Sequence, residues 1–435
     1  MTRSFITKAL WLAALVSVGF TGCGRRDDPT TPVAQGETGT VAKFTHDFGP
    51  TGAGYLPANG EGLTLTESPL RTSKTYRPPG YRDKGEGRPY PVLYLLLNFG
   101  GNGGNGGNDD VTDEYYFEVG LRRIADSLIL GGVIKPMMIA TVDLYNAYGG
   151  SWYQSNNIQG MYEDCMTEFV AYTDTATNFS RQNGRLSRGV SGVGMGGYGA
   201  IYMAMSHPEL FSSASSINGH LAFTTASPTH DFKGIEEWIP YVFAENFVTP
   251  LSPYVPPTDE AALPYYSMSP NINRALFKPY TNLMFSMAAA FSPFDPATAT
   301  LNDSLTWMNA AMAGGQDRSW KVAMPFDWAG QIWPSAWSKW QEGDVAQILS
   351  RNPVALADIQ VLVMSGTSTN FNILQQNRVF HDVALARGAS TVEYREFDGY
   401  EGYPTVQRNY LDRTIRDILI FHSEHFIADP DAQGP

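Results

Sequence analysis

The stretch GVSGVGMGGYGA, residues 189–200, decides the fold. It opens with small and branched apolar residues typical of a buried strand, and it closes with residues at the start of a helical pattern. Glycines at Gly192, Gly194 and Gly196 separate the two parts, so the chain can turn sharply between them. The stretch therefore predicts a strand that leads directly into a helix through a tight turn.

Strands and helices are predicted to alternate on both sides of this turn. Continuous apolar runs such as PVLYLLL, residues 91–97, are typical of strands that are buried on both faces of a sheet. The alternation predicts an α/β fold, with a mostly parallel sheet and helices on both of its faces. The predicted strands are 91–97, 137–142, 189–193, 212–217, 359–364 and 392–397, and the predicted helices are 114–130, 161–177, 197–207, 375–387 and 405–426.

The turn resembles the nucleophile elbow of the α/β-hydrolases. The run GMGGYGA, residues 194–200, is similar to the elbow of the Putative esterase family, which reads G-x-S-M-G-G-Y/F-G-A, and the family's histidine–proline pair follows at His207-Pro208. That family comprises feruloyl and acetylxylan esterases, S-formylglutathione hydrolases and mycolyltransferases. The resemblance covers most of residues 65–220 and 355–428, and it implies an α/β-hydrolase fold.

The resemblance also places the three catalytic positions, and none of them holds the residue of the family. The serine position falls on Gly194, the acid position on Thr369 and the histidine position on Tyr403. Glycine has no oxygen or sulfur with which to form an acyl intermediate, and a phenol with a pKa near ~10 is a poor base at neutral pH. The oxyanion loop H-G-x-G-G becomes LNFGG at 97–101. We therefore predict that the triad is vestigial.

Several other polar residues are candidate sources of chemistry. Ser191 lies on the predicted strand, where its side chain should point into the sheet or its flank, and His220 either approaches the site from above or is a surface or capping residue. Asp398, Glu401 and Asp327 offer carboxylates for acid–base work on a glycoside, although the spacing does not fix their separation. No metal-binding or phosphate-binding motif is present, so no cofactor and no metal are predicted.

A long interruption at about 220–354 predicts a lid insertion over the site. It is rich in proline and aromatic residues and holds seven of the nine tryptophans of the chain. These aromatic side chains either form the lid's own core or line a ligand groove. The resemblance places the wall of a ligand pocket at Asn98, Phe99, Trp152, Tyr153, Met195 and Tyr198.

The first residues predict export and a lipid anchor. Residues 1–22 have a positively charged start and an apolar core at 9–20 that is shorter than the roughly 20 residues of a membrane span, as in a signal peptide. The following FTGC resembles a bacterial lipobox, which predicts lipidation of Cys23; the alternative is an ordinary secretory signal with a chance cysteine. We expect a flexible tether over 23–43 and a hydrolase-like domain over 44–430, on the outer membrane or cell surface outside the cytoplasm.

The charge of the chain argues against nucleic acid as a partner. The formal net charge is −13, and removal of the leader, which takes two basic residues away, leaves 28 basic against 43 acidic residues. The sequence predicts a catalytically inactive hydrolase that acts as a surface binding module, with an ester-bearing glycan such as acylated polysaccharide, or a small molecule, as ligand. The alternatives are an active carboxylic-ester hydrolase with a displaced nucleophile and a structural partner in an envelope complex.

Overall fold

The structure is a computed structural model that describes residues 38–49, 70–83, 89–99, 120–146, 148–176, 184–246, 278–293, 322–326, 329–401 and 408–427. By its internal contacts the chain divides into two units, Met1–Pro32 and Val33–Pro435, and every described residue belongs to the second. The predicted signal peptide and Cys23 lie outside the described residues, so their roles stay predictions. Within the described ranges, no helix is long and apolar enough to cross a bilayer.

The centre of the second unit is an eight-stranded sheet with the order β1-β2-β4-β3-β7-β8-β9-β10. The strands from β3 onward run parallel to one another, and β1 and β2 are paired antiparallel at one side. This confirms the predicted mostly parallel α/β fold. The strands are β1 Thr40–Asp47, β2 Leu70–Arg77, β3 Val92–Leu96, β4 Met138–Val142, β7 Arg188–Val193, β8 Ser213–Ile217, β9 Gln360–Thr369 and β10 Val392–Glu401, with a separate small pair β5 Ser155–Asn156 and β6 Gly160–Met161.

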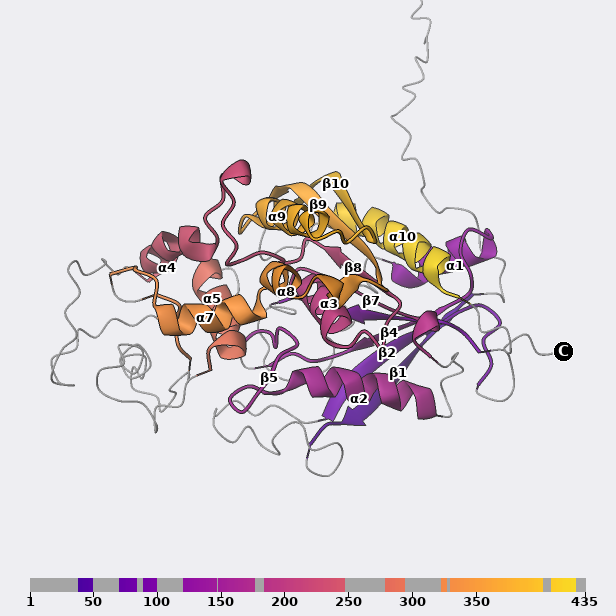
Figure 1. Ribbon diagram of the computed structural model, residues 1–435. Coiled ribbons are helices and arrows are strands. Elements are labelled where there is room, and N and C mark those ends of the chain that lie inside the picture. The colour runs from indigo at the N-terminus through magenta and orange to yellow at the C-terminus, as the bar shows by residue number, and fades with distance from the viewer. Residues whose placement is uncertain are drawn as a thin grey trace, which may run out of the picture. The chain divides into compact units, whose positions relative to one another are not determined.

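Helices cover both faces of this sheet (Figure 1). The side chains of β3 alternate between the two faces, so both faces need a cover. Tyr94 packs into the core beneath one set of helices, whereas Leu93 and Leu95 pack into the core beneath the other. The first set is α2 Tyr162–Thr175, α3 Met195–Ser206, α8 Val345–Arg351 and α9 Ile373–Ala386, and the second is α1 Leu121–Leu130 and α10 Arg408–His425.

Several element boundaries differ from the predictions. The helix α3 begins at Met195, directly after the turn, and β1 begins at Thr40 rather than at the predicted domain start of Phe44, because its residues pair with β2 along their whole length. The strands β9 and β10 continue to Thr369 and Glu401, because these two residues still pair after an irregularity in the register.

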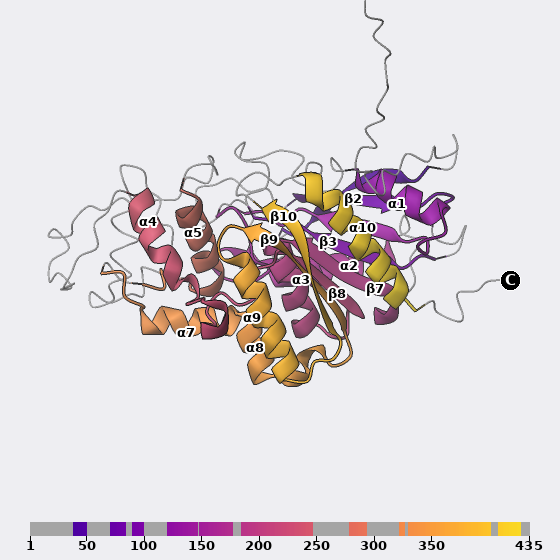
Figure 2. The same cartoon turned by 90° about the horizontal axis from the view of Figure 1, so that it is seen from above.

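The described part of the lid insertion is helical. Its helices α4 Ile239–Glu245, α5 Pro279–Phe291 and α7 Pro334–Gly343 lie at the end of the domain away from α1 in both views (Figures 1 and 2). Trp238 and Trp340 are fully buried there, which favours the interpretation that these two tryptophans form the lid's own core. Trp307, Trp320 and Trp328 lie outside the described residues.

Candidate functional site

The turn between β7 and α3 has the geometry of a sharp elbow. Gly194 stands at its apex with φ 56° and ψ −117°, a backbone conformation that side-chain-bearing residues adopt only under strain. Its N–H donates to the carbonyl oxygen of Ile217 over 2.9 Å, and its own carbonyl oxygen accepts from the N–H of Tyr198 over 3.0 Å. The elbow is thus tied to β8 on one side and to the first turn of α3 on the other.

The side chain of Asn98 lies over the apex of this elbow. Its Oδ1 accepts hydrogen bonds from the backbone N–H of Met195 over 3.0 Å and from that of Phe99 over 2.8 Å. A Cβ built on Gly194 would overlap this oxygen and would lie 2.7 Å from Asn98 Cγ. The Asn98 side chain therefore fills the volume in which the Cβ of a nucleophilic residue at position 194 would lie.

The two N–H groups that bind Asn98 Oδ1 come from the positions that form an oxyanion hole in α/β-hydrolases. Met195 is the residue after the apex and Phe99 belongs to the loop after β3, and these are the two places from which α/β-hydrolases build an oxyanion hole. Both donors point at one oxygen, as such a hole requires. In this chain that oxygen is a side-chain carbonyl of the protein itself.

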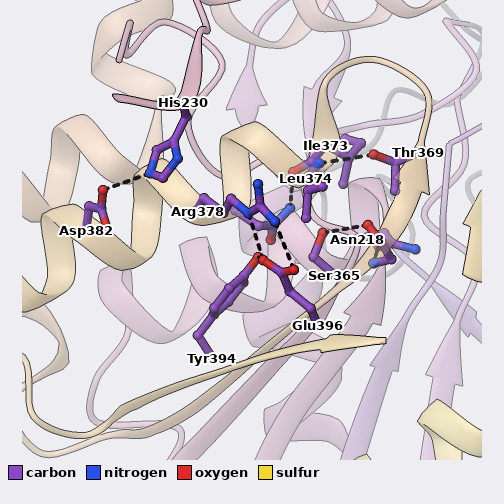
Figure 3. A network of polar contacts seen from close by, with 12 residues as sticks. Asn218, His230, Ser365, Thr369, Ile373, Leu374, Arg378, Asp382, Tyr394 and Glu396 are labelled. Carbon is purple, nitrogen blue, oxygen red and sulfur yellow. Dashed lines mark hydrogen bonds and ion pairs between the residues drawn. The ribbon is translucent and has the colours of Figure 1, made fainter. Parts of the chain in front are cut away.

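The acid position has a structural role. Thr369 is the last residue of β9, and its Oγ1 accepts the N–H of Leu374 over 3.1 Å at the start of α9 (Figure 3). Phe371 and Asn372, in the turn between them, both have positive φ angles of 56° and 55°. Tyr403, the position assigned to the histidine, lies outside the described residues. The hydroxyl of Thr369 thus binds one of the N–H groups in the first turn of α9.

His220 lies among the aromatic residues beneath the lid. Its ring centroid is 5.3 Å from that of Trp152, 6.0 Å from Trp238 and 6.3 Å from Phe371. Nδ1 is buried and has no hydrogen-bond partner among the described residues, and burial lowers the pKa of the imidazole to about 3. His220 is therefore neutral at physiological pH, and no carboxylate or hydroxyl of the described residues bonds to its Nδ1 to make a catalytic pair.

A serine–histidine chain does exist, but it lies inside the domain. Ser215 Oγ donates to Ser191 Oγ over 2.7 Å and is 2.9 Å from His422 Nε2, while Ser213 Oγ is 2.7 Å from His422 Nδ1. All four side chains are fully buried beneath α10, and burial lowers the pKa of His422 to about 3. The sequence predicts Ser191 in this strand but not its partners, because the pairing of Ser191 with Ser215 is set by the register of the two strands.

The residues predicted to form a pocket wall gather around the elbow. The N–H of Trp152 lies 3.4 Å from Met195 Sδ, the Trp152 and Tyr198 rings are 5.4 Å apart, and Tyr153 Oη donates to the carbonyl oxygen of Leu97 over 3.0 Å. Trp152, Tyr153, Met195 and Tyr198 are at most 2% exposed, and Phe99 is 8% exposed. The structure brings these residues together, and their role as a ligand pocket stays a prediction.

The lid contacts the main domain on both sides of the elbow. On one side Trp152 Nε1 donates to Ser286 Oγ of α5 over 2.9 Å, and this hydroxyl donates to the carbonyl oxygen of Gly150 over 2.9 Å. On the other side Trp238 Nε1 donates to Asn372 Oδ1 over 3.1 Å. The described lid helices are thus fixed to the loop after β4 and to the turn after β9.

A buried carboxylate anchors the junction of α7 and α8. Asp344 accepts from the N–H and the hydroxyl of Thr224 over 2.6 and 2.7 Å, and from the N–H groups of Ala346 and Gln347 at the start of α8. Burial raises the pKa of Asp344 to about 6, against the effect of these donors. Across the described ranges, no group of three or more His, Cys, Asp or Glu side chains is placed to hold a metal ion.

Comparison with known proteins agrees with this architecture. Residues 70–265 match the family described as Putative esterase. Among solved structures, a ferulic acid esterase is 14% identical with a TM-score of 0.50, and the match covers 90% of this chain and all of that one. An S-formylglutathione hydrolase from Agrobacterium tumefaciens is 15% identical with a TM-score of 0.43, covering 91% of this chain and 98% of that one. At these identities the structural likeness concerns the fold alone.

Proposed function

We propose that this chain, whose residues 70–265 belong to the Putative esterase family of the α/β-hydrolases, is a non-catalytic binding module of the cell envelope. The observation that carries the proposal is the position of Asn98. Its Oδ1 takes both N–H groups of the oxyanion hole and overlaps the place of a Cβ on Gly194. Gly194 therefore offers a substrate carbonyl no attacking atom, and the N–H groups of Met195 and Phe99 are already taken by Asn98.

The known rate effects of triad removal support an almost complete loss of turnover. Removal of the serine or the histidine of such a triad costs on the order of 10⁶ in turnover. Enzymes without their triad keep roughly 10³–10⁴ over water from the oxyanion hole and from binding. Because Asn98 occupies the hole in this chain, even that residual contribution is diminished.

The proposed ligand is an ester-bearing glycan, such as acylated polysaccharide, or a small ester. The family and the similar ferulic acid esterase support this class of molecule. We further propose that Cys23 carries a lipid and that the domain is held outside the cytoplasm, on the evidence of the FTGC lipobox after the apolar leader.

A second candidate is an active hydrolase with a displaced nucleophile. The hydrogen-bonded chain from Ser191 through Ser215 to His422 is the observation in its favour. Against it, all three side chains are fully buried, so the hydroxyl is out of reach of a substrate. This candidate requires a fluorophosphonate to label the protein at one serine, and Ser191→Ala to abolish the labelling.

The test of the proposal measures turnover and binding on one preparation. The full-length protein should hydrolyse p-nitrophenyl acetate no faster than a heat-denatured control, and it should be retained by acylated polysaccharide more than by the same polysaccharide after alkaline deacylation. Turnover well above the denatured control would overturn the non-catalytic assignment. Equal retention by both polysaccharides would overturn the ligand class.

A further inference from the structure

Large hydrophobic side chains are exposed mainly along one edge of the sheet. We call this the amino edge, because the parallel strands β3, β4 and β7–β10 all begin there; the elbow lies at the opposite edge. Of the nine large hydrophobic side chains that the described residues expose, seven lie in elements at the amino edge, whereas Leu70 and Tyr241 lie elsewhere. The seven, exposed by 41% to 73%, are Val41, Leu130, Val133, Leu186, Val354, Leu385 and Ile427.

Hydrogen bonds join the segments that carry these side chains. The N–H of Ile427, after α10, donates to the carbonyl oxygen of Leu186, just before β7, over 3.0 Å. Lys135, in the connection from α1 to β4, donates through Nζ to the carbonyl oxygen of Phe426 over 2.8 Å. Arg185 donates to the carbonyl oxygen of Asp358, just before β9, over 2.7 Å. These bonds join the segments that carry Val133, Leu186 and Ile427 to one another and to the segment before β9.

The amino edge also carries positive charge that is not paired with carboxylates. Lys135, Arg185 and Arg387 donate to carbonyl or hydroxyl oxygens, and none of them forms an ion pair with another described residue. The same edge also carries exposed acids, namely Glu209, Asp358, Asp382, Glu393 and Glu424. Exposed apolar side chains with interspersed charges of both signs suit the boundary between water and a phospholipid surface.

The chain enters the described domain at this same edge. Thr40 begins β1 opposite Arg77, the last residue of β2, and the N–H of Gly39 donates to Asp126 Oδ1 of α1 over 2.9 Å. If Cys23 carries the lipid, residues 24–37 connect it to this point. A tether of that length spans at most about 50 Å and typically about 20 Å, so the amino edge lies within reach of the membrane.

We propose that the amino edge docks on the phospholipid surface to which the chain is anchored, and that the elbow and the lid face away from it. The proposal rests on the proposed lipid anchor at Cys23. Docking limits the orientations of the domain, so its ligand approaches from the side of the lid.

The test places a fluorophore on the full lipidated chain in vesicles of phosphatidylethanolamine and phosphatidylglycerol that contain a doxyl-labelled quencher lipid. Val133→Cys and Ile427→Cys report on the amino edge, while Leu70→Cys and Tyr241→Cys are matched exposed controls. Cys165 does not interfere, because it is fully buried and burial raises its pKa. We expect quenching at positions 133 and 427 to exceed that at 70 and 241 several-fold.

The outcomes separate this proposal from the proposed anchorage. Intact mass of the same preparation shows whether Cys23 carries a lipid; a chain without lipid would overturn both the anchorage and the docking. A lipidated chain with equal quenching at all four positions would overturn the docking alone.

Discussion

The side-chain carbonyl oxygen of Asn98 lies where a side chain on Gly194 would begin, and it accepts the N–H groups of Met195 and Phe99. The two residues are complementary, because the asparagine fits only where the apex has no Cβ. The glycine at the serine position and the occupation of the oxyanion hole by Asn98 therefore depend on each other.

Gly194→Ser should destabilise the protein without producing an esterase. The apex conformation costs a residue with a side chain about 1–3 kcal/mol, and overlap with Asn98 adds to this cost. Urea unfolding measures the loss. Adding Asn98→Ala should give a double variant that is more stable than the sum of the two single effects predicts, by about 0.5–3 kcal/mol. Strict additivity would show that the two positions are independent.

Asn98→Ala should lower the free energy of unfolding by about 1–3 kcal/mol, because it leaves two backbone donors without their acceptor. Asn98→Asp, which keeps an oxygen at the same place, is the matched control and should retain more of the stability at neutral pH. The prediction fails if alanine and aspartate at this position are equally well tolerated.

His220→Phe should make the protein less sensitive to acid. The folded pKa of about 3 lies below the ordinary value of 6.5, so the stabilising contribution of the neutral imidazole is complete above pH 6.5 and is lost as the pH falls toward 3. Phenylalanine fits a site lined by Trp152, Trp238 and Phe371 and does not titrate. Between pH 7 and pH 4 the wild type should lose about 3 kcal/mol more than the variant. Parallel curves of unfolding free energy against pH would contradict this.

Asp344→Asn should reveal a pH dependence of opposite sign. Because the folded pKa of Asp344 is raised to about 6, its contribution is complete below the unfolded value of about 4 and decreases as the pH rises through 6. The stability of the wild type relative to the variant should therefore fall by up to about 3 kcal/mol between pH 4 and pH 6. A difference that is constant or grows with pH would show that the donors around the carboxylate outweigh its burial.

Ser286→Ala should loosen the lid. It removes the acceptor of Trp152 Nε1, and a buried donor left unpaired costs about 1–3 kcal/mol. Hydrogen exchange should become faster in α5 while β7 and β8 stay protected. Ser338→Ala, at an exposed position on α7, is a control that should leave both regions unchanged. Equal hydrogen exchange of α5 in both variants would show that the hydrogen bond between Trp152 and Ser286 does not hold the helix.

Much of the fold was predictable because the signals were local. Apolar runs such as residues 91–97 indicate strands buried on both faces, and the glycine-rich stretch at 189–200 indicates the turn, so predicted and observed strands largely coincide. The ends of β9 and β10 were not predictable. They depend on pairing of Tyr400 and Glu401 with Ser368 and Thr369, which no periodicity in either segment reveals.

The site was predictable in part. The absence of a nucleophile at Gly194 follows from the sequence, and the altered loop at 97–101 was visible as a departure from the family. That Asn98 would accept from Met195 depends on a side-chain rotamer and on two segments 97 positions apart, so it required the structure. The hydrogen-bonded series of side chains from Ser191 to His422 was not predictable for the same reason, because its members come from β7, β8 and α10.

The most direct measurement is the intact mass of the full-length protein during incubation with excess p-nitrophenyl acetate, followed by peptide mapping. We predict an unchanged mass for every residue around the elbow, because Gly194 has no atom to acylate and Asn98 holds the oxyanion donors. An acyl group trapped during turnover on a residue of the elbow, or on Ser191, would contradict the central claim.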